Sequence, residues 1–356
     1  MNQDTGDSSH QTAGDTLDSP PPLIDEAIAA GLVQRHYGLT SVAKAFACER
    51  DATFQIQTTN GQRFTLKLSN PAEAPLNTNF QTEAMLWMER MNPDLPVPKM
   101  MRASDGRYEI PVRMADGRTS ILRLLTWLEG IPVAVAGTSE QLRANIGRLL
   151  AELGLSLKGF DHPASSLDIQ WDIKNASRLR PMIDALSDKA LRAQLLAELD
   201  HFDAEVQPAL AGFRQQIIHN DLNLHNLLVG ANGSGRVSGV LDFGDMVKTP
   251  LVIDLAVAAA YMTHQPEGAL RCVTDIVAAY HAVTPLLPNE IVLLRDLIVA
   301  RLMTTIAITE WRSARYPQNA AYILRNNTPA RLGLERFATL PREDVTTALL
   351  RACKME

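Results

Sequence analysis

The chain has 356 residues, of which 46% are hydrophobic and 21% charged, and its formal net charge is −6. This length is long for one ordinary core, so we expect two packed lobes of a globular protein. The acidic balance, the dispersed Lys and Arg residues and the 5% of aromatic residues argue against a nucleic-acid partner. The three cysteines, Cys48, Cys272 and Cys353, are far apart and odd in number, which predicts reduced, small buried side chains rather than disulfides or zinc ligands.

The N-terminal 22 residues are polar and acidic and contain no hydrophobic segment of the kind that secretory signals carry. We expect them to form a disordered arm. The longest apolar run, at residues 251–262, is interrupted by Asp254 and is too short to cross a bilayer. These features predict a cytoplasmic protein without a membrane partner.

The first third of the remaining chain alternates short β-compatible segments with segments of helical periodicity. We expect helices at residues 23–37 and 71–91, and strands at residues 42–48, 53–58, 63–68, 97–102, 109–114 and 120–125. Thr59-Asn60-Gly61 lies between the second and third strands and is a hairpin signal, because Asn and Gly tolerate the left-handed backbone of a tight turn.

The chain beyond residue 139 is predicted to be mainly helical. The longest amphipathic helices are expected at residues 140–158, 190–205 and 290–311, with a β interruption at residues 216–218, 227–229 and 237–241. A β-rich part followed by a helical part is an α+β arrangement. We therefore predict a disordered arm (1–22), an N-lobe (23–125) and a C-lobe (126–356), joined by a hinge at residues 126–130. The Lys and Arg residues of the C-terminal helices are expected at the solvated surface.

The informative stretch is residues 217–245, which contains His219-x-Asp221-x-x-x-x-Asn226 and then Asp242-Phe243-Gly244. Phosphoryl transfer develops negative charge on phosphate oxygens, so magnesium must be held there by hard oxygen ligands. The carboxylate of Asp242 and the amide oxygen of Asn226 are such ligands. A separate carboxylate, Asp221, is expected to accept the proton of the acceptor hydroxyl. Apolar runs on both sides predict a strand–loop–strand context for this chemistry.

The motifs HNDLNLHN and LDFGD resemble those of the aminoglycoside phosphotransferase and choline kinase superfamily, and the resemblance runs from about residue 23 onward. It implies a protein-kinase-like fold with a small β-rich N-lobe and a larger helical C-lobe. It also implies a small-molecule kinase that uses Mg²⁺ and either ATP or GTP. Asn223, a possible substrate contact, stands where the superfamily usually has a second histidine. This departure, with Asp245 and the apolar helix that follows, looks most like the hydroxylysine kinase branch, and homoserine kinases are the nearest alternative.

The resemblance also implies nucleotide-binding residues upstream. Lys67 fits the strand lysine that contacts the α- and β-phosphates, and Glu83 is its expected ion-pair partner, although Glu73 and Glu89 lie on the same predicted helix. Residues 49–54 take the place of the phosphate-covering turn. They lack a Gly-x-Gly-x-x-Gly pattern, so backbone N–H groups and the Thr53 hydroxyl are expected to contact phosphate.

The segment after Asp242 argues against a protein substrate. Only about ten residues separate it from the next predicted helix, and no Ala-Pro-Glu follows. This leaves no room for a peptide-binding activation loop. We expect the acceptor to be a small amino alcohol or hydroxy amino acid, hydroxylysine-like first, with aminoglycoside- or choline-type acceptors as further alternatives.

Five residues near the motifs have roles that the sequence leaves open. His219 is either a catalytic acid or, as we prefer, a structural support of the loop, and Asp254 is either a buried brace of that loop or a helix-start acid. Asp245 either holds a second ion or a substrate ammonium, or is a solvated turn residue. Trp171 and Tyr261 are candidates for the acceptor pocket by position, with core packing or helix capping as the alternative.

Two other classes of function are alternatives to a kinase. A metal-dependent hydrolase, with zinc held by the alternating side chains of residues 219–225, would leave Asp-Phe-Gly unexplained. A non-catalytic nucleotide-binding module is expected to lack the base or a metal ligand, whereas the chain retains all of them. The sequence contains no signal for the oligomeric state, for ATP against GTP or for the number of magnesium ions.

Overall fold

The structure is a computed structural model that describes residues 19, 21–48, 50–230 and 235–355. The described residues cluster into two compact units. The first comprises the described residues up to Thr82, with Met100–Trp127 and Ser166–Gln170, and the second comprises Glu83–Lys99, Leu128–Ser165 and the described residues from Trp171 onward. Residues 83–99, which the sequence had assigned to the N-lobe, thus cluster with the second unit. Of the predicted arm, only residues 19, 21 and 22 are described, and the Ser19 carbonyl accepts a hydrogen bond from Asn70.

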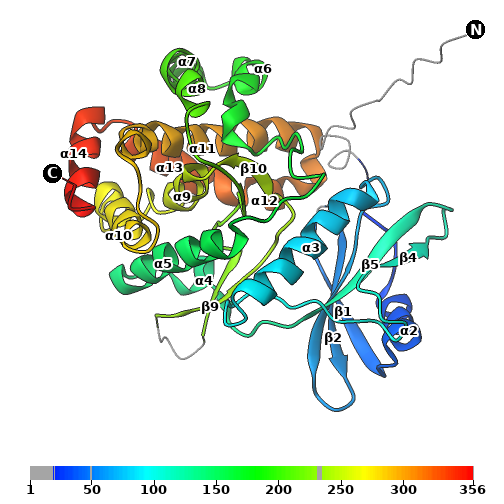
Figure 1. Ribbon diagram of the computed structural model, residues 1–356. Helices are drawn as coiled ribbons and strands as arrows, with labels where there is room; N and C mark the ends of the chain where they lie inside the picture. The colour runs from blue at the N-terminus through cyan, green and yellow to red at the C-terminus, as the bar shows by residue number, and fades with distance from the viewer. Residues whose placement is uncertain (1–18, 20, 49, 231–234, 356) are drawn as a thin grey trace, which may run out of the picture. The chain divides into compact units, whose positions relative to one another are not determined.

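The first unit is built on a five-stranded antiparallel sheet of order β1-β2-β3-β5-β4 (Figure 1). Its elements are α2 (Glu26–Tyr37), β1 (Ser41–Phe46), β2 (Ala52–Thr58), β3 (Arg63–Leu68), β4 (Ile110–Arg113) and β5 (Thr119–Thr126). Alternate residues of the central strands, such as Phe64, Leu66 and Leu68, point into a core that also receives α2. This matches the predicted β-rich part of the chain.

The β2–β3 hairpin forms at the predicted turn. The Thr58 N–H donates to the Gln62 carbonyl at 2.9 Å, and Gly61 adopts a φ of 85°, a conformation that glycine allows without a Cβ clash. The strand predicted at residues 97–102 is wrong: the pairing there is limited to an isolated bridge between Met100 and Leu125. Pro98 cannot donate a backbone hydrogen bond, which explains why a ladder does not form.

The second unit is mainly helical. Its helices are the end of α3 (Pro75–Met91), α4 (Val133–Ala136), α5 (Glu140–Leu157), α6 (Arg180–Asp184), α7 (Lys189–His201), α8 (Gln207–Leu210), α9 (Val252–Ala260), α10 (Ala269–His281), α11 (Pro288–Arg315), α12 (Ala320–Ile323), α13 (Asn327–Phe337) and α14 (Arg342–Ala352). Short 3-10 or π turns complete it at Ile173–Leu179, Phe202–Val206, Pro317–Asn319 and Leu324–Asn326. The predicted helix at 190–205 therefore ends early, because the backbone changes to a π turn after His201.

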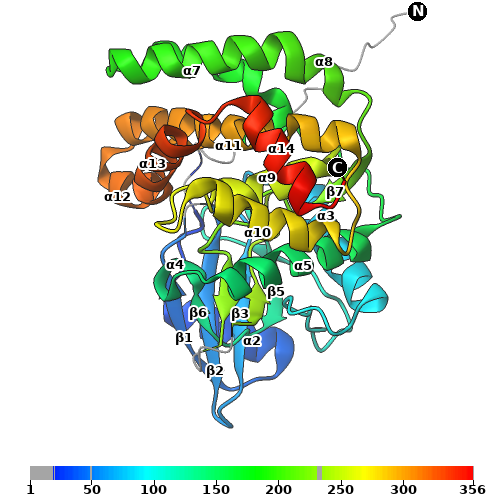
Figure 2. The same cartoon turned by 90° about the vertical axis from the view of Figure 1, so that its left-hand side faces the viewer.

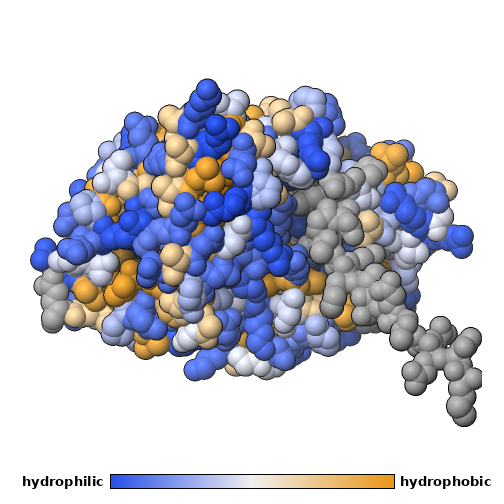
Figure 3. Space-filling view, turned by 90° about the horizontal axis from the view of Figure 1, so that it is seen from above, coloured by the Kyte–Doolittle hydropathy of each residue, from blue (hydrophilic) through white to orange (hydrophobic). Residues whose placement is uncertain are grey.

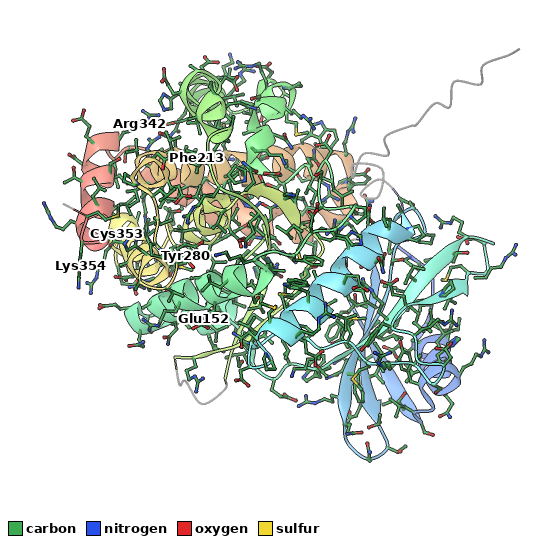
Figure 4. The ribbon with its side chains drawn as sticks, viewed as in Figure 1. Glu152, Phe213, Tyr280, Arg342, Cys353 and Lys354 are labelled. Atoms are coloured by element: carbon green, nitrogen blue, oxygen red, sulfur yellow. The ribbon has the colours of Figure 1, made fainter. Side chains whose placement is uncertain are left out.

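Helices α5 and α10 lie side by side in the second unit (Figure 2). Gly147 of α5 faces the backbone of α10, where an added Cβ would overlap the Ile276 carbonyl oxygen. Tyr280, labelled in Figure 4, lies on the buried side of α10 and is 1% exposed. Burial raises the pKa of its hydroxyl. The glycine thus permits a close helix–helix contact that larger residues would not.

Two small antiparallel sheets interrupt the helices of the second unit. One pairs β7 (Gln215–Ile218) with β10 (Val247–Pro250), and the other has the order β6 (Ile131–Pro132), β8 (Leu227–Val229), β9 (Val237–Val240). The strands predicted at residues 216–218, 227–229 and 237–241 are confirmed, whereas β6 and β10 were not predicted. These short strands fix both ends of the segments 219–226 and 241–246.

Charged residues of helix α11 are buried, contrary to the expected solvated surface. Arg295 and Arg301 are each 2% exposed and Arg312 is 4% exposed. Arg295 is paired with Glu198 and Asp296, so its charge is compensated inside the unit. These pairs explain how α11 can be buried along much of its length.

The surface gives two further observations. Within the described part of the chain, every helix is too short or too polar to span a membrane. Seen from above, hydrophilic residues dominate the surface and hydrophobic residues form small separate groups (Figure 3). Cys272 and Cys353 are buried, as predicted, whereas Cys48 is exposed, so the prediction of a buried side chain is wrong for Cys48.

Candidate active site

The loop of residues 219–226 connects β7 to β8, and a buried carboxylate at the start of α9 holds its first turn. Asp254 is 2% exposed and accepts the His219 N–H at 3.3 Å and the Asn220 N–H at 2.8 Å. Burial raises the pKa of Asp254, against the opposing effect of His219 and the two N–H donors. The structure thus places Asp254 in the bracing position that the sequence suggested.

Asn220 has a φ of 64°, which few residues other than glycine adopt. The usual superfamily motif has glycine here, and Asn is among the residues that tolerate this conformation best. Its side-chain amide is buried, and neither of its polar atoms has a hydrogen-bond partner among the described residues. Asp221 follows Asn220 directly, and its side chain contacts Arg301 instead of Asp254.

His219 is fully buried and both ring nitrogens are engaged. Nε2 lies 3.0 Å from the Leu241 carbonyl oxygen, and Nδ1 accepts the Asp221 N–H at 3.3 Å. The ring also makes an edge contact with Phe243, with centroids 4.9 Å apart. His219 therefore links the 219–226 loop to the segment after β9, which is a supporting arrangement rather than that of a metal ligand.

The Asp221 carboxylate is the centre of the site and accepts three side-chain hydrogen bonds. Oδ1 accepts from Nη2 of Arg301 at 2.7 Å, and Oδ2 accepts from the amides of Asn223 and Asn226, each at 2.9 Å. Burial raises the pKa of Asp221 to about 6; the Arg301 charge opposes this rise, and Asp245 and Asp242 add to it. The three donors thus orient the carboxylate, and the Arg301 charge beside Oδ1 favours its ionised form.

Asn223 and Asn226 stabilise the loop from within. The Asn223 Oδ1 accepts the backbone N–H groups of His225 and Asn226, while its Nδ2 donates to Asp221. Asn223 is 1% exposed, so the structure gives it a supporting position and shows no free group for a substrate. The Asn226 Nδ2 donates to the carbonyl and the carboxylate of Asp221, which leaves its Oδ1 without a partner among the described residues.

Asp242 and Asp245 follow β9. Asp242 is exposed and has a φ of 59°, and its Oδ1 accepts the Gly244 N–H at 3.3 Å. Sparsely populated backbone conformations of this kind are often found at functional sites. Asp245 is 8% exposed and close enough to raise the pKa values of both Asp221 and Arg301, so it belongs to the same charged cluster and is not a solvated turn residue.

Arg301 is the site residue that the sequence analysis missed. Its Nη2 bonds to Asp221 and, at 3.0 Å, to the Tyr261 hydroxyl, and its Nη1 bonds to the Trp171 carbonyl at 3.2 Å. The two predicted pocket candidates, Trp171 and Tyr261, are thereby linked to Asp221 through Arg301. The available signal was that Arg301 is the single charged residue of the otherwise uncharged stretch 297–308. A charge in such a stretch indicates burial, and a buried charge requires a partner.

The nucleotide-binding candidates lie mainly in the first unit. Lys67 on β3 is 3.9 Å from the Asp51 carboxylate and pairs in register with Thr53 on β2. Glu49, the first residue of the predicted phosphate-covering turn, lies outside the described residues. Glu83 is half-buried on α3, at the first position of the second unit, and its pairing with Lys67 stays a prediction.

Known proteins resemble this chain over most of its length. It is 29% identical to a hydroxylysine kinase of Mus musculus over 329 residues, covering 86% of this chain and 87% of that protein. An amicoumacin kinase solved with AMP-PNP and Ca²⁺ matches with a TM-score of 0.66 at 13% identity, over 90% of this chain and 97% of that chain. A choline kinase from Cryptosporidium parvum matches with a TM-score of 0.55 at 12% identity, over 91% and 100%.

The β-sheet lobe and the helical lobe are therefore those of the protein-kinase-like phosphotransferases, as predicted. The enzyme is a small-molecule kinase with a nucleotide as phosphate donor. The model of the phosphotransferase enzyme family (APH) matches residues 43–290, which is more than half of the sequence, and the chain accordingly belongs to this family.

Proposed function

We propose that this kinase transfers the γ-phosphate of ATP or GTP to the hydroxyl of a small hydroxy amino acid or amino alcohol, with hydroxylysine as the first candidate and homoserine as the second. The observation that carries the proposal is the Asp221 carboxylate, which Arg301, Asn223 and Asn226 orient with three hydrogen bonds. The relative named hydroxylysine kinase supports the choice of acceptor. We also propose a cytoplasmic location, with which the free thiols of Cys272 and Cys353 agree.

In this proposal Asp221 accepts the proton of the acceptor hydroxyl. Oδ2 already accepts two hydrogen bonds, whereas Oδ1 accepts one, so Oδ1 has a remaining lone pair for the incoming hydroxyl. The three donors fix the rotation of the carboxylate, and this orientation is what a general base needs before the acceptor arrives.

Asn226 and Asp242 fit a magnesium site. Both present oxygen atoms, the Asn226 Oδ1 is not used by the described residues, and Asp242 is exposed. A magnesium ion bound there would neutralise negative charge on the phosphates. The two residues would hold the ion, while Asp221 remains engaged by Arg301 and the asparagines.

The nucleotide residues are proposed from the family pattern and from the first unit. On nucleotide binding, Lys67 would replace its 3.9 Å contact with Asp51 by a contact with the phosphates. Thr53, its neighbour on β2, would donate a hydrogen bond from its hydroxyl to a phosphate oxygen. Glu83 is proposed to orient Lys67. On the acceptor side, the buried negative charge of Asp245 suits a substrate ammonium group.

The proposal is tested by a nucleotide-consumption assay against hydroxylysine, homoserine, ethanolamine, choline and an aminoglycoside. Asp221→Asn should lower kcat by about 100- to 10,000-fold, because the proton acceptor is lost, while the KM for the nucleotide stays close to that of the wild type. Asp203→Asn, at a half-exposed position paired with Arg180, is the matched control and should keep full activity. Near-normal turnover by Asp221→Asn would show that another group accepts the proton.

A further inference from the structure

The rings of Trp171 and Tyr261 both lie near the guanidinium of Arg301, which also pairs with Asp221. The Cζ atom of Arg301 lies 5.4 Å from the Trp171 ring centroid and 5.7 Å from the Tyr261 ring centroid. Both distances are within the range of a cation–π interaction. A guanidinium thus occupies the position where an aromatic pair could otherwise receive a ligand cation.

Arg301 is held firmly in this position. Its side chain is 2% exposed, and Asp221, the Tyr261 hydroxyl and the Trp171 carbonyl accept three of its N–H groups. Displacing it would break these bonds and leave Asp221 without its counter-charge. An acceptor must therefore bind with Arg301 in place.

The guanidinium still has donors to offer. Arginine carries five N–H groups, and three hydrogen bonds are formed, so two remain. One of them is the buried Nε, which has no partner among the described residues. The Nε of Arg295 is likewise buried without a partner among the described residues, so the distinguishing feature of Arg301 is that its two unused donors lie beside Asp221, where the acceptor would bind.

The position of Arg301 has opposite consequences for two acceptor classes. The ring faces that usually bind a quaternary ammonium alcohol such as choline are covered by Arg301, and choline carries no anionic group for the guanidinium. A hydroxy amino acid brings a carboxylate, for which a guanidinium is the preferred partner.

We propose that Arg301 determines the acceptor class, by excluding quaternary ammonium alcohols from the Trp171–Tyr261 pair and by pairing with the carboxylate of a hydroxy amino acid. Arg301 also positions Asp221 through Oδ1. The inference rests on the proposed function, because it needs Asp221 to be the base that faces the acceptor hydroxyl.

The test compares two acceptors with the same enzyme preparation. The fraction of enzyme that is folded then affects both kcat/KM values equally and cancels from their ratio. The ratio of kcat/KM for hydroxylysine to kcat/KM for choline is measured for the wild type, Arg301→Met and Arg301→Lys. Loss of a charge-assisted hydrogen bond to the acceptor should lower this ratio by about 10- to 100-fold in Arg301→Met. Arg301→Lys keeps the charge and should recover part of the ratio.

Arg295→Met is the matched control, because Arg295 is an equally buried arginine of α11. Its partners are Glu198, Asp296 and the Ala338 carbonyl, and none of its hydrogen bonds involves Asp221. Arg342 contacts the same two carboxylates. This variant should be destabilised by the loss of a buried pair, yet its hydroxylysine-to-choline ratio should equal that of the wild type.

An unchanged ratio in Arg301→Met, or a wild type that prefers choline, would overturn the inference while leaving the kinase proposal intact. If the wild type phosphorylates none of the acceptors, the proposed function fails instead. Binding of hydroxylysine and of choline, measured by calorimetry without nucleotide, then decides the inference separately. Tighter binding of hydroxylysine than of choline by the wild type but not by Arg301→Met supports it, and equal preference in both overturns it.

Discussion

The substitution Asp254→Asn tests the brace beneath the 219–226 loop. The carboxylate accepts two consecutive backbone N–H groups, from His219 and Asn220. An asparagine keeps one acceptor oxygen and turns an NH₂ group toward the other N–H, so one buried donor loses its partner. Such a loss costs about 1–3 kcal/mol, and we expect the free energy of unfolding to fall by this amount in denaturant titrations.

The same substitution should also reduce turnover, because Asp221 follows Asn220 directly in the chain. A shift of the base by about 1 Å can cost about 100-fold in rate, so we expect kcat to fall by about 10- to 100-fold with little change in the KM for the nucleotide. Asp188→Asn is the control: Asp188 also accepts two backbone N–H groups, at the start of α7, where asparagine caps equally well. A destabilised Asp254→Asn with wild-type kcat would refute the coupling between brace and base.

Two further substitutions test the metal site and the helix packing. Asp242→Asn should remove a carboxylate ligand and abolish most of the thermal stabilisation by magnesium and ATP, while the melting temperature without ligands stays near that of the wild type, since Asp242 is exposed; equal stabilisation of both proteins would argue against this ligand. Gly147→Ala should lower the free energy of unfolding by about 1–3 kcal/mol, because the new methyl group meets the Ile276 carbonyl and forces α5 from α10. Gly31→Ala, in α2 with open space around it, should instead be neutral or stabilising by up to about 1 kcal/mol.

Local signals in the sequence were sufficient for much of the fold. The Thr59-Asn60-Gly61 turn was readable because its backbone conformation depends on the turn residues themselves. The helix at residues 23–37 was placed correctly, but it begins at Glu26, since Asp25 caps it by accepting the Ile28 N–H. The two-residue strand β6 and the strand β10 escaped prediction because pairing with distant partners, rather than an apolar pattern, defines them.

The residues of the site also differ in whether local sequence or long-range packing determines their position. The spacing of Asp221, Asn226 and Asp242 was visible, because the chemistry requires those residue types on neighbouring turns. Arg301 is 80 residues beyond Asp221 and reaches it only through the packing of α11, which no local pattern encodes. Asn223 was read as a substrate contact, although its side chain is consumed by loop hydrogen bonds that depend on the turn geometry.

The position of Arg301 on α11 limits how this enzyme could acquire a new acceptor. Its immediate neighbours along the helix, Ala300 and Leu302, belong to the hydrophobic core. The helix segment that we propose contacts the acceptor is thus also part of the core that keeps the unit folded. A substitution of Arg301 that changed the acceptor would also destabilise the fold, so it would have to arise in a variant with a higher free energy of unfolding. Enzymes that bind their substrates through surface loops can change specificity without this extra stability.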